Sequence, residues 1–88
     1  MELALADPKG LIRESYAIEG ITAPECRSIF LDWALSLPEG TDTSAALEAL
    51  VVRYGADTAH PMTQVLRDGL EQAARTGRRG GRAGRRQG

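Results

Sequence analysis

Residues 22–37 read TAPECRSIFLDWALSL, and this stretch carries the clearest structural signal in the chain. Thr22 and Glu25 have the spacing of a capping box, in which the two side chains satisfy free backbone N–H groups where a helix begins. Apolar residues then recur at the spacing of one helical face, and they are Cys26, Ile29, Phe30, Trp33, Ala34 and Leu37. Pro38 and Gly40 follow as stop signals. We therefore predict an amphipathic helix over this stretch, with one face in a core.

An earlier helix is indicated by Asp7 and Pro8, because Asp can cap a helix and Pro suits its first turn. The sequence predicts this helix over about residues 8–18, ended by Gly20 in the left-handed conformation. Its apolar side consists of Leu11, Ile12, Tyr16 and Ile18. The preceding residues 1–6, MELALA, are too few to classify.

Two later helices have similar signals. Asp42 or Ser44 can cap a helix of about residues 43–54, and Pro61 suits the first turn of a helix of about residues 61–75. Their inward residues are Leu47, Leu50, Val51 and Tyr54 in the first, and Met62, Val65, Leu66, Leu70 and Ala73 in the second. Gly69 also falls on the inward face, where a missing side chain predicts a close helix crossing.

The expected fold is therefore all-α, a small bundle of about four short helices. A helical domain of residues 1–75 is followed by a basic tail of residues 76–88, TGRRGGRAGRRQG. The tail has no apolar residue larger than alanine, so it cannot bury enough surface to offset the entropy of ordering, and we expect it to be disordered.

The charges of the chain are strongly divided. Six of its eleven basic residues lie in the last fourteen positions, which contain no acid, namely Arg75, Arg78, Arg79, Arg82, Arg85 and Arg86. The other five basic residues are outnumbered by twelve acidic residues, so residues 1–74 carry a charge of about −7 although the whole chain carries only −1.

A flexible chain of Arg and Gly can follow a phosphate backbone or stack on bases. Residues 75–86 thus resemble the arginine-glycine segments of RNA-binding proteins, without their interleaved aromatics, and this resemblance implies binding of RNA or single-stranded DNA. The alternatives are a solubilising tail, or a tail that folds back on the acidic body.

A helix-turn-helix is a weaker interpretation of residues 8–37. Tyr16 stands where that motif wants a small residue, and Glu19 where it wants an apolar one. The candidate recognition helix carries Glu25 and Asp32 against a single Arg27, which is the wrong charge balance for a helix among phosphates.

The sequence offers no catalytic motif, cofactor motif or metal-ligand spacing. Cys26 is the single cysteine, which excludes an intramolecular disulfide, and its place on the apolar stripe favours a buried thiol over a nucleophile. His60 is the single histidine and is expected to belong to the start of the last helix. Neither a signal peptide nor an apolar stretch of about 20 residues is present, so the expected location is cytoplasmic and no membrane contact is expected.

Trp33 and Tyr16 are the candidate residues of a protein interface, because aromatic side chains often anchor such contacts. Core packing is the alternative for Trp33. A chain with so small a core is often stabilised by self-association, which favours a homodimer built on the helix of residues 22–37 or that of residues 61–75.

We expect a small non-enzymatic interaction or regulatory protein whose helical body binds a protein partner or itself, with no cofactor. The alternative is a nucleic-acid-binding accessory protein that uses the Arg/Gly tail.

Overall fold

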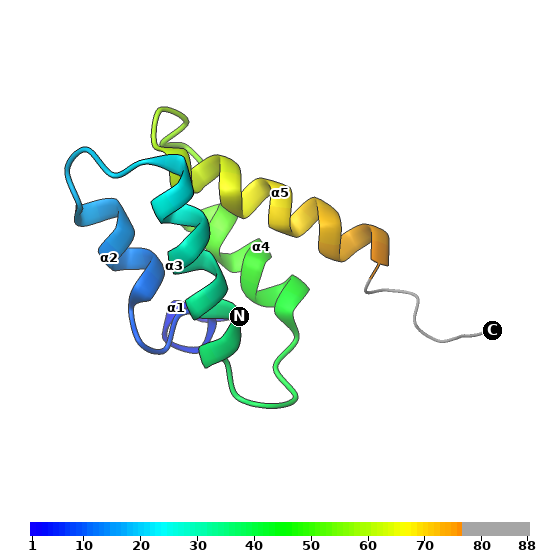
Figure 1. The fold of residues 1–88 in the computed structure, drawn as a ribbon. Helices are drawn as coiled ribbons and strands as arrows, with labels where there is room; N and C mark the ends of the chain where they lie inside the picture. The colour runs from blue at the N-terminus through cyan, green and yellow to red at the C-terminus, as the bar shows by residue number, and fades with distance from the viewer. Residues whose placement is uncertain (77–88) are drawn as a thin grey trace.

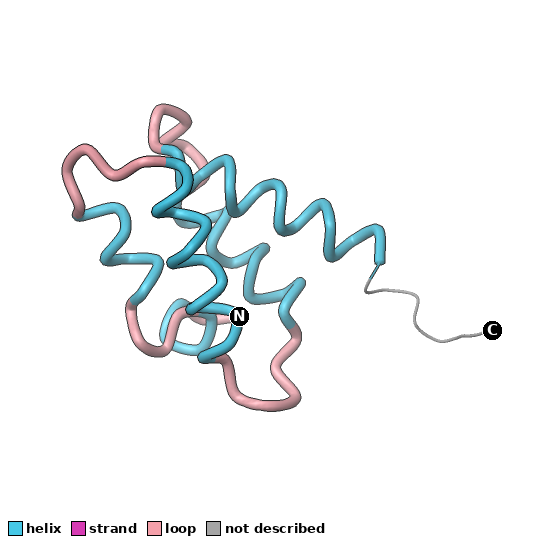
Figure 2. The backbone as a smooth tube through the Cα atoms, viewed as in Figure 1, coloured by secondary structure: helices cyan, strands magenta, loops and turns pink. Residues whose placement is uncertain are grey.

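The computed structural model describes residues 1–76, which form five helices and no strand (Figures 1 and 2). The helices are α1 (Leu3–Ala6), α2 (Leu11–Ala17), α3 (Ala23–Ser36), α4 (Thr43–Tyr54) and α5 (Pro61–Thr76). The expected all-α bundle is confirmed. α5 packs against both α3 and α4, α2 packs against α3, and α1 packs against α4. The expected disorder of the tail concerns residues that lie outside the described part of the chain, apart from Thr76, which ends α5.

α3 begins as the sequence predicts. The backbone N–H of Glu25 donates to Thr22 Oγ1 at 3.3 Å, and the N–H of Thr22 donates to Glu25 Oε1 at 3.0 Å. These reciprocal bonds are the capping box, with Pro24 in the first turn. α4 is capped in the simpler way, because the N–H of Ala45 donates to Asp42 Oδ1 at 3.1 Å.

The N-terminal segment differs from the prediction in two ways. Residues 3–6 form a short helix, α1, and the next helix begins at Leu11 rather than near Pro8. Asp7 does cap α2, but from outside it, since its Oδ2 accepts the N–H of Arg13 at 3.0 Å. The intervening turn needs Gly10 at φ 68°, a left-handed conformation that other residues rarely adopt.

The end of α2 also differs from the prediction. Ile18 was expected on the apolar side of this helix, but the helix ends at Ala17. Ile18 has an extended backbone and a side chain that is 45% exposed. The predicted left-handed glycine follows two residues later, because Gly20 has φ 76°.

Trp33 lies at the centre of the core. It is fully buried, its ring lies 5.4 Å from that of Phe30, and its Nε1–H donates to the carbonyl of Ala6 at 2.7 Å. This bond ties α1 to α3. The other buried apolar residues are Ala6, Ile12, Ile21, Cys26, Ala46, Leu47, Leu50, Met62 and Leu66. The remaining residues of the predicted stripes on α3, α4 and α5 are partly buried against them.

Cys26 is fully buried, and burial is the main cause that raises the pKa of its thiol above 9.0, with the charge of Glu25 as a second cause. Since the thiolate is the reactive form, we expect an alkylating reagent to label the native protein about a hundredfold more slowly than the unfolded chain. The rate of mass increase with iodoacetamide, with and without denaturant, measures this difference. Because no other cysteine is present, all of the mass increase reports on Cys26. Similar rates in both conditions would contradict a buried thiol.

Candidate functional site

The first candidate site is a groove between α3 and α5. The two helices begin close together and then diverge (Figure 1). The groove has a volume of about 600 Å³. Its lining residues are Ala23, Arg27, Phe30 and Leu31 from α3, and Pro61, Gln64, Val65, Asp68, Gly69 and Gln72 from α5. We call this feature the α3–α5 groove.

Gly69 determines how closely the two helices approach at this groove. A Cβ atom added at Gly69 would lie only 2.6 Å from Cζ of Phe30. The close crossing predicted from this glycine is therefore confirmed, with the Phe30 ring as the group that occupies the space.

Two leucines are exposed on α3, and the first of them, Leu31, lines the groove. Leu31 is 61% exposed and Leu35, one turn further along, is 84% exposed. Neither belongs to the predicted inward stripe, and neither was among the predicted site residues. The sequence did contain a signal, because the two leucines are spaced i, i+4 and lie outside that stripe. The outer face of a solvent-exposed helix is usually polar, so such a pair indicates an apolar surface.

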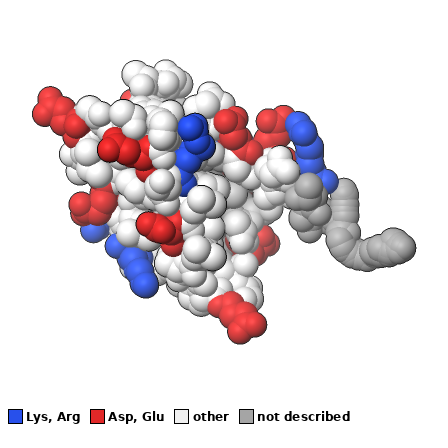
Figure 3. Space-filling view, in the orientation of Figure 1, with Lys and Arg blue, Asp and Glu red and all other residues white. Residues whose placement is uncertain are grey.

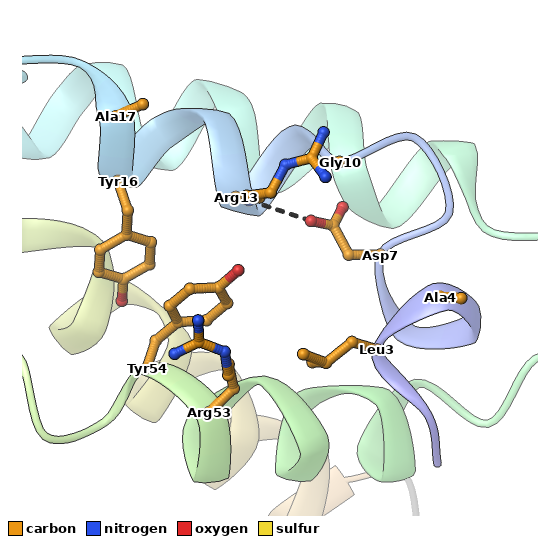
Figure 4. Close-up of a pocket in the computed structure, with 9 residues that line it drawn as sticks. All are labelled: Leu3, Ala4, Asp7, Gly10, Arg13, Tyr16, Ala17, Arg53 and Tyr54. Atoms are coloured by element: carbon orange, nitrogen blue, oxygen red, sulfur yellow. Dashed lines mark hydrogen bonds between the residues drawn. The ribbon is translucent and has the colours of Figure 1, made fainter.

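The second candidate site is a pocket between α2 and α4, closed at one end by α1 (Figure 4). α2 packs mainly on α3 and α5 and has little direct contact with α4. The space left between α2 and α4 has a volume of about 550 Å³. It is lined by Leu3, Ala4, Asp7, Gly10, Arg13, Tyr16, Ala17, Arg53 and Tyr54. We call this feature the α2–α4 pocket.

Tyr16 organises the aromatic end of this pocket. Its ring stacks on that of Tyr54, with centroids 4.4 Å apart and planes 9° apart, and it lies 4.3 Å from the His60 ring at a tilt of 34°. Its hydroxyl is hydrogen-bonded to Thr63 Oγ1 at 2.6 Å. Tyr16 therefore joins α2 to the end of α4 and the start of α5.

Burial is the largest cause that raises the pKa of Tyr16 above 10.0. The hydrogen bond to Thr63 lowers the pKa, and the charges of Asp57, Cys26 and Tyr54 add smaller increases. The folded state therefore favours the neutral phenol, as it favours the neutral thiol of Cys26.

These two shifts predict that alkaline pH destabilises the protein. A folded-state pKa above the unfolded value means that the unfolded chain loses its proton first, so stability is intact below the unfolded pKa and falls as pH rises. We expect the free energy of unfolding to decline around pH 9, where the Cys26 thiol is about half ionised in the unfolded chain, and more steeply above about pH 10.

Urea unfolding at successive pH values, followed by circular dichroism, measures this decline. In Tyr16→Phe the steeper part above about pH 10 should be reduced, because phenylalanine does not ionise. A wild-type profile that stays flat to pH 11, or a Tyr16→Phe profile as steep as the wild type, would contradict the assignment.

The residues expected to act in binding lie in different places. Trp33, a candidate interface residue, is enclosed in the core, where a partner would not reach it without opening the fold. Tyr16 is partly buried and borders the α2–α4 pocket. Arg75 lies near the end of α5, with Nη2 3.3 Å from Glu71 Oε2. The other five arginines of the predicted nucleic-acid site lie outside the described residues.

His60 belongs to the start of α5, as expected. Its Nδ1 accepts the N–H of Met62 at 3.0 Å, which places the histidine as a cap of the helix. Its Nε2 is buried and has no hydrogen-bond partner within residues 1–76.

Neither membrane spans nor metal clusters occur in the described part of the chain. None of its helices combines the length and apolarity needed to cross a bilayer. No three His, Cys, Asp or Glu side chains within residues 1–76 are grouped closely enough to hold a metal ion.

Comparison of the chain with protein-family models, curated proteins and solved structures finds no match.

Proposed function

We propose that the protein is a non-enzymatic interaction protein whose α3–α5 groove binds an amphipathic helix with basic flanks from a partner protein. The observation that carries this proposal is a pair of exposed leucines on α3, of which Leu31 lines the mostly apolar groove and Leu35 extends the same exposed row by one turn beyond it. An amphipathic helix places side chains at i, i+4 spacing into such a groove, and the leucines supply the matching ridge.

Charge favours a basic partner. Residues 1–74 carry about −7, and acidic side chains are spread over the visible face of the molecule (Figure 3). The groove lining itself holds one acid, Asp68, and one base, Arg27, and Asp32 is exposed next to Leu31. A second copy of the chain brings the same acidic body, so it is repelled where a basic helix is attracted.

The test uses the full chain and two synthetic helical peptides with the same leucine stripe, one with lysine and one with glutamate on the polar face. Fluorescence anisotropy of labelled peptide measures the affinity. We expect the Leu/Lys peptide to bind more tightly than the Leu/Glu peptide. The substitution Leu35→Glu should raise the Kd of the Leu/Lys peptide about tenfold or more, since the new carboxylate lies in the apolar contact.

Val52→Glu is the matched control, because Val52 is 86% exposed on α4, away from the groove, and Leu35 is 84% exposed on α3. Neither substitution touches the core, and both add the same charge. Equal effects of the two substitutions, or equal affinity for both peptides, would overturn the proposal. A dimer in sedimentation equilibrium that Leu35→Glu abolishes would instead assign the groove to a second copy.

A second candidate function is binding of RNA or single-stranded DNA by the basic tail. The observation that favours it is the run of six arginines without an acid in the last fourteen residues. It is compatible with the first function, because the groove and the tail are separate parts of the chain.

A further inference from the structure

We propose that the α2–α4 pocket binds a small aromatic monoanion. The pocket is independent of the α3–α5 groove, since the two share no lining residue. Its volume of about 550 Å³ lies within the range of small-molecule sites. Like such sites, it combines apolar walls with a few polar groups.

The walls suit a flat, apolar group. Leu3 of α1 points into the cavity toward the aromatic rings of Tyr16 and Tyr54 (Figure 4), and Ala4 also lines it. The stack of Tyr16 on Tyr54 joins α2 and α4 at one end, and α1 packs on α4 at the other. The space between them is therefore a consequence of how the helices are arranged.

The charges select an anion. Two of the five basic residues in the acidic body, Arg13 and Arg53, border this one cavity. The guanidinium of Arg53 lies 5.1 Å from the Tyr54 ring centroid and has no ion-pair partner within residues 1–76. Arg13 is directed toward Gly10 at the rim, and its only ion pair in this part of the chain is a 4.0 Å contact with Glu14.

Asp7 limits the ligand to one negative charge. Its Oδ2 is used by the N–H of Arg13, whereas its Oδ1 is buried without a partner among the described residues. Asp7 lies on the α1 side of the cavity, across from the tyrosines (Figure 4). An anionic group can therefore approach Arg53, while a second anionic group near Asp7 would be repelled.

The experiment compares two probes with the same ring system in titrations followed by fluorescence. Anilinonaphthalene sulfonate carries one sulfonate, and N-phenylnaphthylamine carries none. We expect the sulfonate to bind the full-length native protein, and Arg53→Met to weaken it about tenfold by removing the charged donor. Binding of the neutral probe should not change. Arg27→Met is the matched control, because Arg27 borders the α3–α5 groove instead.

Methyl chemical shifts locate the bound sulfonate. Ala4 and Ala17 should shift if it occupies the α2–α4 pocket, and Ala23 should shift if it occupies the groove. The proposal is overturned if Ala23 alone shifts, if Arg27→Met weakens binding as much as Arg53→Met, or if Arg53→Met has no effect. None of these outcomes bears on binding of a helix to the groove.

Discussion

Replacing Trp33 with alanine is expected to lower the free energy of unfolding by about 3–5 kcal/mol. Trp33 is fully buried, so the change removes the largest side chain of the core and leaves a cavity. It also leaves the Ala6 carbonyl without the indole donor that binds it at 2.7 Å. A domain of about 76 residues has a total stability of roughly 4–11 kcal/mol, so this loss removes a large share of it. Urea unfolding followed by circular dichroism measures the effect.

Trp33→Phe separates packing from the hydrogen bond. Phenylalanine keeps most of the apolar volume but has no donor for the Ala6 carbonyl, so we expect an intermediate loss of about 1–3 kcal/mol. Hydrogen exchange at residues 3–7 should then increase more than exchange in α4, because the lost bond is the one that ties α1 to α3. A loss below about 1 kcal/mol for Trp33→Ala would contradict the central position of this residue.

The three longest helices were predictable because their signals are local. The capping box of α3 joins Thr22 to Glu25, and the cap of α4 joins Asp42 to Ala45, each over three residues. The stripes that follow supply the core, with Trp33 in α3 as its largest member. Gly69 also carried correct information, since a glycine on an inward face has few explanations other than a close neighbour.

The N-terminal part was not predictable in this way because longer-range contacts decide it. α1 has only four residues and no side-chain cap. It is held by burial of Ala6 and by a hydrogen bond from Trp33, which lies 27 positions away. The start of α2 depends on a hydrogen bond between Asp7 and Arg13, which are six positions apart. A cap at such a distance has no fixed sequence spacing.

Both candidate sites were largely missed for a similar reason. The α2–α4 pocket depends on the stack of Tyr16 on Tyr54, which are 38 positions apart in the sequence. The exposure of Leu31 and Leu35 depends on how many helices surround α3, and a sequence stripe does not specify that number. Tyr16 was a candidate interface residue, but the rings that surround it could not be predicted without the fold.

Removing residues 77–88 is expected to abolish binding of RNA and single-stranded DNA, if the basic tail is their binding site. The deletion takes away five arginines and leaves the whole of α5, which ends at Thr76. Fluorescence anisotropy with labelled oligo(U) and oligo(dT) at roughly 20 mM salt measures the affinity, since weak screening favours detection. An equal affinity of the truncated chain would exclude the tail as the site, and no binding by the full chain would exclude the function.

The dependence on salt tests the mechanism of this binding. If the tail neutralises four or five phosphates, log K should fall against log salt with a slope of about −3, because each contact on a single strand contributes about −0.7. The affinity should then decrease several hundredfold, by this estimate, between roughly 20 mM and 150 mM salt. Replacing the five arginines with lysine should keep that slope, whereas glutamine should remove it.

The acidic body, at about −7, repels the same polyanion. Neutralising Asp68 and Glu71 of α5 should therefore strengthen binding at low salt. A basic helix seated in the α3–α5 groove would have the same effect, which predicts that the Leu/Lys peptide and the oligonucleotide bind with positive cooperativity.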